Sequence, residues 1–312
     1  DAPPEAQKIA QFICDGVDDD VEIQAAIDTL GAADLSVGHF NVRTIRLKED
    51  GIRIQGQGSN TILRHQNNVN FPMFITVTDD RPPDGTTAGY TGRPQGFGGI
   101  ILKGFHIEGN SANNMVRLPE PDDFEAEGIC LRWAYNYIIE DISINDVVCF
   151  GIYVNTGPSA PRTNGRIARC EVTGTTGVVD AAYEPFGKSG ASIFVTCPYT
   201  VGVDIVDCLV HDNLTVGLAL EDRVSDIRVK GGNYSRNQRH GIALHPAYNV
   251  RIEDALINLN GGLGIQVGSG DSRPIWINRC QLIGNAMGPI NTVQFGYGQS
   301  GDIFFADDNV VG

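Results

Sequence analysis

The chain has 312 residues, with 23 lysines and arginines against 38 aspartates and glutamates, which gives a net charge of −15. This charge argues against nucleic acid as a partner, because phosphate binding requires a basic face. The sequence contains no apolar run of 18 residues, so it predicts no membrane-spanning helix.

The first predicted element is an amphipathic helix at about residues 15–31. Its sequence, DGVDDDVEIQAAIDTLG, places acidic residues before an apolar pattern and ends at a glycine. Asp18, Asp19 and Asp20 are interpreted as residues of the helix N-terminus, which the helix dipole favours, rather than as a metal site. We expect this helix to close one end of the repeat that follows.

Two irregular stretches, at about residues 65–98 and 111–126, are rich in proline, glycine and aspartate. Loops of this length inside a compact protein are usually functional. We therefore expect both stretches to form walls of a binding groove.

A repeat with strand periodicity occupies about residues 128–290. Its last four copies share an asparagine at steps of 23 to 25 residues, namely Asn213, Asn237, Asn260 and Asn285. Apolar and polar residues alternate within the copies, which indicates strands, and a unit of this size must stack on its neighbours to bury its apolar face. The predicted fold class is all-β: a right-handed parallel β-helix with an N-terminal capping α-helix, in one domain spanning residues 1–312.

Two columns of equivalent residues are predicted inside the stack. One column consists of Ile142, Cys170, Cys208, Ala255 and Cys280. The other consists of the four asparagines, which we expect to bond to one another at a corner where each adopts a left-handed backbone conformation. The chain has seven cysteines, and a disulfide between Cys170 and Cys208 on adjacent coils stays open.

Outward positions on one face are indexed from the glycine that opens each coil. The residue before this glycine and the fourth residue after it give two columns: Glu127, Phe150, Ser189, Val216, His240 and Leu263, and Arg132, Asn155, Phe194, Glu221, His245 and Gly268. His240, His245 and Glu221 then fall on adjacent coils, with Arg239 beside them. Imidazole exchanges a proton near neutral pH and guanidinium neutralises a carboxylate, so this group is the main candidate site. Solvated turn residues are the alternative interpretation of the histidines.

Further candidates surround this group. The segment 180–188 interrupts the repeat and carries Tyr183, a candidate acid, and Lys188, a candidate carboxylate ligand. Packing of the tyrosine under its own loop is the alternative. Four residues on the same face are candidates for substrate binding: Arg132, Tyr153, Asn155 and Glu221.

The stretch from about Gly190 to Gly268 resembles the catalytic A-module of secreted mannuronan C5-epimerases. HDNLTVG stands where that family has His-Asp-Asn-Gly, and residues 237–242, Asn-Gln-Arg-His-Gly-Ile, stand where it has Asn-Asp-Arg-His-Gly-Phe. The resemblance implies that His240 is catalytic, with Arg239 beside it. DGVDDDVEIQAAID and GFHIEGN are similar to elements found in many pectate-lyase-like β-helices.

One motif of that family is missing. The family has Tyr-Gly-Phe-Asp-Pro-His-Glu two coils before its histidine, where residues 189–195 here read Ser-Gly-Ala-Ser-Ile-Phe-Val. Tyr183 is followed by Glu-Pro, so a tyrosine and an acid-proline pair occur nearby, but they are not in register with the family's motif. Either His245 replaces the missing histidine or the substrate differs.

The leading hypothesis is a polysaccharide enzyme that removes the C5 proton of a uronic-acid unit. Arg239, Asn155 or a bound calcium ion would neutralise the carboxylate, His240 would be the base, and Tyr183 or His245 would handle the second proton. Reprotonation would make the protein a C5-epimerase, an isomerase, whereas loss of the 4-oxygen would make it a lyase.

Two other function classes stay open. One is a glycoside hydrolase that uses Glu221 and Asp222 as its carboxylate pair. The other is a non-catalytic glycan-binding spike or adhesin. In each case the expected partner is a polysaccharide, anionic and uronate-containing in the leading hypothesis, and the expected setting is extracellular, either secreted or on a cell or virion surface, as a monomer or trimer.

Overall fold

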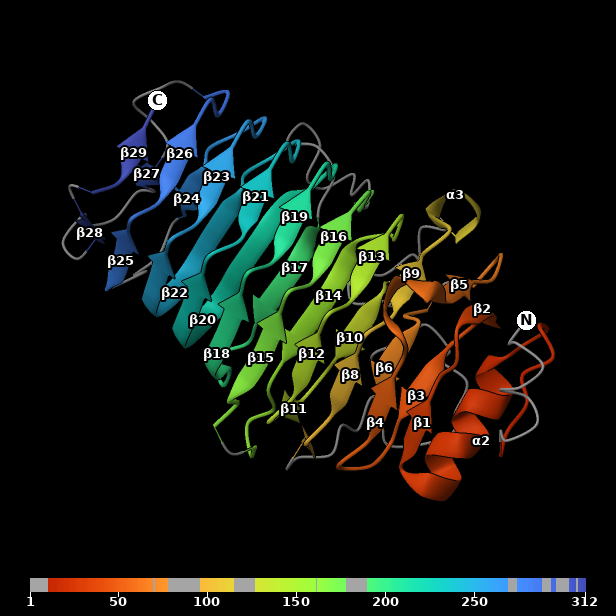
Figure 1. Cartoon of the computed structure of the whole chain (residues 1–312). Helices are drawn as coiled ribbons and strands as arrows, with labels where there is room; N and C mark the ends of the chain where they lie inside the picture. The colour runs from red at the N-terminus through yellow and green to blue at the C-terminus, as the bar shows by residue number, and fades with distance from the viewer. Residues whose placement is uncertain are drawn as a thin grey trace.

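The computed structural model describes residues 11–69, 71–77, 96–114, 127–160, 162–177, 190–268, 274–287, 293–295, 303–306 and 308–312. In these residues the chain winds into coils of parallel strands around one apolar interior (Figure 1). Each complete coil contributes a strand to three faces, and each strand pairs with its neighbours on the adjacent coils.

The strands of the first face are β3 (Ile45–Leu47), β6 (Phe74–Thr76), β10 (Ile129–Leu131), β14 (Phe150–Asn155), β17 (Ala191–Thr196), the first parts of β20 (Val216–Lys230) and β22 (Ile242–Glu253), β24 (Ile265–Val267) and β27 (Val293–Phe295). Those of the second face are β1 (Ala32–Asp34), β4 (Arg53–Gln55), β8 (Ile101–Lys103), β12 (Ile138–Glu140), β15 (Gly165–Ala168), β18 (Val201–Val206), the remainders of β20 and β22, β25 (Ile275–Asn278) and β28 (Ile303–Phe305).

The third face is a separate ten-stranded sheet. Its strands are β2 (Gly38–Val42), β5 (Thr61–His65), β9 (His106–Glu108), β13 (Ser143–Asn145), β16 (Glu171–Thr173), β19 (Leu209–His211), β21 (Asn233–Ser235), β23 (Leu256–Asn258), β26 (Gln281–Ile283) and β29 (Val310–Val311). A small extra sheet pairs β7 (Phe97–Gly98) with β11 (Ala134–Tyr135), and the short helices η1 (Gly58–Asn60) and α3 (Ser111–Asn114) complete the described elements.

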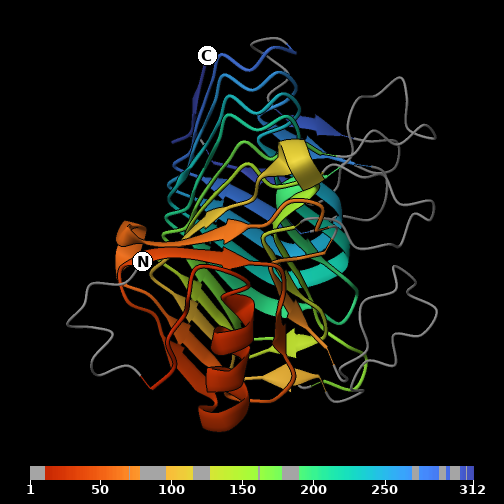
Figure 2. The same cartoon turned by 90° about the vertical axis from the view of Figure 1, so that its right-hand side faces the viewer.

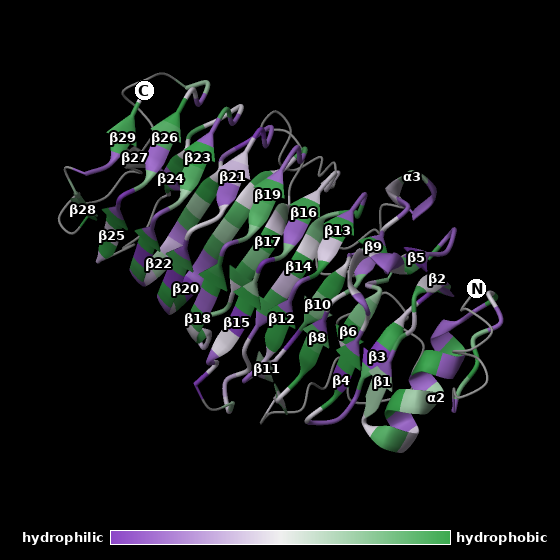
Figure 3. Cartoon of the chain, viewed as in Figure 1, coloured by the Kyte–Doolittle hydropathy of each residue, from purple (hydrophilic) through white to green (hydrophobic). Residues whose placement is uncertain are grey.

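The strands alternate between interior and exterior residues, as Figure 3 shows by hydropathy. The predicted interior column is confirmed, because all its members are buried: Ile142, Cys170, Cys208, Ala255 and Cys280. All seven cysteines are free, so Cys170 and Cys208 are neighbouring thiols rather than a disulfide.

The asparagine ladder is confirmed in its bonding and wrong in its backbone geometry. Asn213 Nδ2 donates to Asn237 Oδ1 at 2.8 Å, Asn237 to Asn260 at 3.1 Å, and Asn260 to Asn285 at 2.9 Å. The left-handed residue is the one before each asparagine: Asp212, Arg236, Leu259 and Gly284, with φ between 51° and 65°. The corner therefore turns one residue early, which directs each amide inward, where it also donates to a main-chain carbonyl.

The predicted capping helix is α2 (Asp20–Leu30), which lies across the N-terminal end of the stack (Figure 2). Ile23, Ala26 and Ile27 are buried against the core, and Gly31 ends the helix with φ 68°. Asp19 does not cap the helix with its side chain. Its carboxylate instead accepts the backbone N–H groups of Gly16 at 2.8 Å and Asn41 at 2.7 Å, which fastens the helix start to β2.

The two stretches expected to form groove walls are only partly described. Residues 74–76, inside the first stretch, form strand β6 of the first face rather than loop, because they pair with both β3 and β10. Residues 111–114 form α3, and residues 78–95 and 115–126 lie outside the described part. No helix in the described residues is long and apolar enough to cross a membrane.

Candidate active site on the first face

The strand register places the second predicted column, which holds the fourth residue after each coil's glycine, on the outer side of the first face. One member of this column differs from the prediction. Asn155 pairs with Thr196, and Glu221 pairs with His245. Phe194, which was predicted for this column, instead pairs with Tyr153 and Ala219. The reason is that Ser192, not Gly190, lies opposite Gly151, so indexing from Gly190 displaces this coil by two residues.

Most of the first predicted column is covered by neighbouring atoms, although Val216 packs with Phe150 in an apolar cluster separate from the interior. Glu127, Val216 and Leu263 are buried, whereas Phe150 and His240 are half-buried. The counterpart of Phe150 and Val216 in β17 is Ala191, because of the same two-residue displacement, and Ser189 lies outside the described residues.

His245 lies beside Glu221 on the preceding coil. Its Nδ1 is 3.6 Å from Glu221 Oε1, and both side chains are about one-third exposed, at 34% and 33%. This separation is that of an ion pair and is too long for a hydrogen bond. Nε2 is buried against the next coil at Gly268 and has no hydrogen-bond partner in the described residues. Gly268 makes room for the ring, since a Cβ at this position would collide with it.

His240 is held in one tautomer by the next coil. Its Nδ1 accepts the backbone N–H of Leu263 at 3.0 Å, and a Cβ at Gly262 would lie 2.7 Å from the same nitrogen. The neutral ring therefore carries its proton on Nε2. Burial lowers the pKa of His240 to about 4, and the nearby charges of Arg239 and His245 add to the effect. His240 is thus a hydrogen-bond donor at neutral pH, whereas the sequence interpretation made it a base.

Glu221, Arg239, His240 and His245 form one group, here called the histidine cluster. Arg239 precedes His240 where the chain enters β22, and its influence on the pKa of His240 shows that its charge lies near the ring. The structure thus brings these four predicted residues together on adjacent coils of one outer face. Both imidazoles lie on the outside of the stack.

A second group, the aromatic cluster, lies on earlier coils of the same face. It consists of Arg132, Phe150, Tyr153, Asn155 and Phe194. Phe150 stacks on Phe194 at 4.8 Å between ring centroids, and the Arg132 guanidinium lies 5.4 Å from the centre of the Tyr153 ring. Asn155 donates through Nδ2 to the Tyr153 hydroxyl at 2.9 Å. Burial raises the pKa of Tyr153 well above its usual range, so its phenol stays neutral.

Glu127 lies at the edge of the aromatic cluster. It is 3% exposed, and its Oε2 has no hydrogen-bond partner in the described residues. Burial raises the pKa of Glu127 to about 7, and the positive charge of Arg132 opposes this rise. A buried carboxyl group with a raised pKa therefore lies at the edge of the aromatic cluster.

The two clusters are adjacent along the face, because Phe194 lies on β17 and Glu221 lies on the neighbouring strand β20. Asn155 and His245 occupy strands β14 and β22, which are separated by β17 and β20. Three strand spacings of about 4.8 Å correspond to about 14 Å. Arg132, Tyr153 and Asn155 therefore cannot touch the same sugar unit as His245. Tyr183 and Lys188 lie outside the described residues.

The structure adds residues that the sequence interpretation missed. Thr196 fills the column between Asn155 and Glu221, and Gly262 provides space for the His240 ring, as Gly268, already predicted for the column beside His245, does for the His245 ring. Thr196 follows the apolar pair Ile193 and Val195, which is in register with Ile152 and Val154, but the alternation alone fits a displacement by two residues equally well. No signal in the sequence distinguishes Gly262 from many other glycines.

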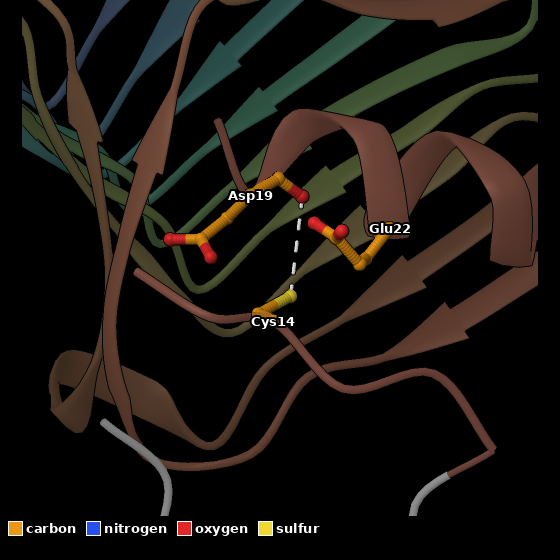
Figure 4. A group of neighbouring side chains, drawn as sticks. All are labelled: Cys14, Asp19 and Glu22. Carbon is orange, nitrogen blue, oxygen red and sulfur yellow. Dashed lines mark hydrogen bonds between the residues drawn. The ribbon is translucent and has the colours of Figure 1, made fainter. Parts of the chain in front are cut away.

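One group of possible metal ligands occurs in the described residues, at the N-terminal cap (Figure 4). Cys14, Asp19 and Glu22 face one another there, but Cys14 donates to the Asp19 main-chain carbonyl and the Asp19 carboxylate is bonded elsewhere. Burial, reinforced by the nearby acids, raises the pKa of the Cys14 thiol to about 12. Calcium binds through six to eight oxygen ligands, so this group does not fit calcium.

Comparison with known proteins agrees with the fold. Residues 178–303 match the family model described as the right handed beta helix region, in agreement with the parallel coils of the structure and with the predicted right-handed parallel β-helix. No curated protein matches the sequence.

Three solved structures share this fold. ORF18 of Geobacillus virus E2 has a TM-score of 0.59 at 15% identity, over 97% of this chain and 59% of that one. The N-terminal fragment of bacteriophage phi29 gene product 12 has a TM-score of 0.53 at 15% identity, over 96% and 65%. The A-module of the Azotobacter vinelandii mannuronan C-5 epimerase AlgE4 has a TM-score of 0.52 at 17% identity, over 89% and 77%. At 15–17% identity, what these three matches show is a shared fold.

Proposed function

We propose that this protein is a polysaccharide-modifying enzyme that removes the C5 proton from a uronic-acid unit. The observation that carries the proposal is the pairing of His245 with Glu221 beside a second imidazole of fixed tautomer on the outer face of the solenoid. A polymer can lie along this face with successive units against successive coils. The Azotobacter protein of the same fold is a mannuronan C-5 epimerase, which supports a glycan as substrate.

The two imidazoles have complementary roles in this proposal. His245 is the base that accepts the C5 proton, and the Glu221 carboxylate beside its Nδ1 stabilises the imidazolium that forms. His240 donates its Nε2–H to an oxygen of the substrate, because its Nδ1 is already occupied by the Leu263 amide. These roles replace the assignment of His240 as the base.

Removal of a proton next to a carboxylate places negative charge on the carboxylate oxygens. Arg239 is the cation of the histidine cluster, and we assign it to stabilise this charge. A bound calcium ion would serve the same purpose through Lewis-acid chemistry. Turnover measured in calcium-free buffer distinguishes the two, since only the arginine keeps its charge there.

The fate of the carbanion decides between two reactions. Reprotonation from the opposite face inverts C5 and gives an epimer, whereas loss of the 4-oxygen cleaves the chain and gives an unsaturated uronate. Tyr183 is proposed as the second proton-transfer group and Lys188 as a carboxylate ligand. An extracellular or virion-surface setting is part of the proposal, and the two phage proteins of the same fold support it.

The test is an assay of alginate, pectate and heparosan for two products. Ultraviolet absorbance of unsaturated ends reports a lyase, and uptake of solvent deuterium at C5 without such absorbance reports an epimerase. We expect His245→Ala and His240→Ala each to reduce turnover about 10²- to 10⁴-fold. His39→Ala, an exposed histidine at the other end of the molecule, should leave turnover unchanged.

Other outcomes identify the rival functions. New reducing ends without unsaturation, abolished by Glu221→Gln, would indicate a hydrolase. Glycan binding that survives both histidine substitutions, with no product of any kind, would indicate a binding spike or adhesin and would end the enzyme proposal.

A further inference from the structure

Strand β20 carries an irregularity immediately beside the histidine cluster. Glu221 pairs with His245 and Val224 pairs with Ala247, so Asp222 and Arg223 on one strand lie opposite Pro246 alone on the other. Proline has no N–H to donate to a sheet ladder, which explains why the extra residue is inserted there. Figure 1 shows the two strands running side by side past this point.

The irregularity has two left-handed residues in succession, whereas coil corners such as those at Asp207 and Arg236 have one. Asp222 and Arg223 both have left-handed conformations, with φ of 57° and 68°, although neither is a glycine. Residues in this conformation are strained, and such strain persists only where surrounding contacts enforce it. Here the Asp222 carboxylate accepts the hydroxyl of Thr196 at 2.7 Å, which anchors the irregularity to the preceding coil of the same face.

The result is an exposed cation at the edge of the candidate site. Asp222 and Arg223 are both exposed, and no ion pair of Arg223 occurs within the described residues. Tyr199, on the corresponding corner of the preceding coil, is 49% exposed. In a chain with a net charge of −15, an arginine held in a strained conformation beside Glu221 and His245 is well placed to attract an anionic ligand.

Arg223 and Arg239 bracket the first face from opposite edges. Arg239 lies where the chain enters β22, before Ile242, whereas Arg223 lies at the bend where β20 leaves the first face after Glu221. The two arginines also belong to adjacent coils, about 4.8 Å apart along the stack. This spacing is close to the length of one pyranose unit, so two neighbouring units can each reach one arginine.

We propose that Arg223 binds the carboxylate of the sugar unit next to the one that reacts. This inference rests on the proposed function and specifies its substrate class: a polymer with uronates at consecutive positions, such as alginate or pectate. A polymer in which every second unit is neutral, such as heparosan, cannot use both arginines at once. Arg223 is a specificity residue, because it contacts a unit that does not react.

The experiment compares polymer binding by Arg223→Gln and Arg251→Gln, both in the His245→Ala background so that the polymers stay intact. Arg251 is an exposed arginine on the second face, stacked over Trp276 at 5.1 Å, and its loss changes the net charge equally. We expect Arg223→Gln to weaken binding of alginate and pectate about tenfold. Binding of carboxyl-reduced alginate and of heparosan should not change, and Arg251→Gln should have no effect. Unchanged binding in Arg223→Gln, or an equal loss in Arg251→Gln, would overturn the inference.

A second variant separates recognition from a structural role. Arg223→Gly removes the left-handed strain as well as the charge. We expect it to raise the thermal midpoint while weakening alginate binding as much as Arg223→Gln does. A lower thermal midpoint would show that Arg223 is a structural residue and would contradict the proposal.

In the otherwise unmodified enzyme, Arg223→Gln should raise KM for alginate and leave kcat nearly unchanged, because the contact is made equally before and during reaction. A loss of kcat alone would contradict this role. Absence of turnover in every variant would refute the proposed function, yet the binding comparison would still decide whether Arg223 recognises consecutive carboxylates.

Discussion

The histidine cluster and the aromatic cluster lie on the same face, but they meet their surroundings differently. In the histidine cluster, the side chains of Glu221 and His245 remain about one-third exposed, although Nε2 of His245 is buried without a partner. In the aromatic cluster, Phe150 and Phe194 stack on each other and Tyr153 is bonded to Asn155. The first arrangement leaves groups available to a substrate, whereas the second uses its contacts to hold neighbouring coils together.

The comparison shows how a uniform scaffold produces a local site. Every coil offers the same outward positions, so chemistry depends only on which residues occupy them. Small residues matter as much as reactive ones, since Gly262 and Gly268 allow the imidazoles to lie against the next coil. Where aromatic rings occupy the outward positions instead, the same geometry yields packing.

The largest expected effect comes from removing the space under His245. In Gly268→Ala the new methyl would displace the ring from its position beside Glu221, and turnover should fall about 10²-fold or more. The measurement is the rate of C5 deuterium exchange on alginate. The double variant Gly268→Ala/His245→Ala should be no slower than His245→Ala alone; additive losses would show that Gly268 acts independently of the histidine.

The two clusters should also respond to pH in opposite directions. The folded-state pKa of Glu127 is about 7, above its ordinary value of 4.5, so its contribution to stability is complete below pH 4.5 and is lost as pH rises through 7. The folded-state pKa of His240 is about 4, below its ordinary 6.5, so its contribution is complete above pH 6.5 and is lost as pH falls through 4. His65, buried and with a pKa also lowered to about 4 by burial, acts in the same direction as His240.

Thermal midpoints of two variants between pH 4 and 8 test this contrast. Between pH 4.5 and 7 the free energy of unfolding of the wild-type protein should fall by about 3 kcal/mol because of Glu127, and Glu127→Gln should abolish this fall. His240→Asn keeps an acceptor for the Leu263 amide but does not titrate. This variant should therefore lose less stability than the wild-type protein as pH falls from 6.5 to 4. If both variants keep the wild-type pH profile, the two buried groups do not control stability in this range.

A smaller effect is expected from the aromatic stack. Phe194→Ala removes a half-buried ring stacked on Phe150 and should lower the free energy of unfolding by about 2 kcal/mol in denaturant titration. Phe304→Ala is the matched control, because Phe304 also stacks on an aromatic ring, Trp276, but is 52% exposed. Its loss should cost less than about 1 kcal/mol. Equal losses would show that stacking, rather than burial, sets the stability of this face.

Parts of the architecture could be predicted because they repeat. The interior column through Cys170 and Cys208 and the ladder through Asn237 follow from residues that recur once in each coil. The position of Phe194 could not be predicted in the same way. A displacement by two residues keeps every side chain on its own side of the sheet, so the alternation of apolar and polar residues cannot reveal it. Only the pairing of Tyr153 with Phe194 fixes which residue lies beside Asn155.

The sequence by itself determined the β-helix, its capping helix and the presence of Glu221, Arg239, His240 and His245 on neighbouring coils, because periodicity and local pattern decide these. Only the tertiary structure decided which nitrogen of His240 carries the proton, which residue stands beside Asn155 and how Arg223 is presented. These features depend on a backbone amide, a strand register and a proline that come from adjacent coils, more than twenty residues away in the chain. Local sequence carries no record of such contacts, since they exist only after the coils have stacked.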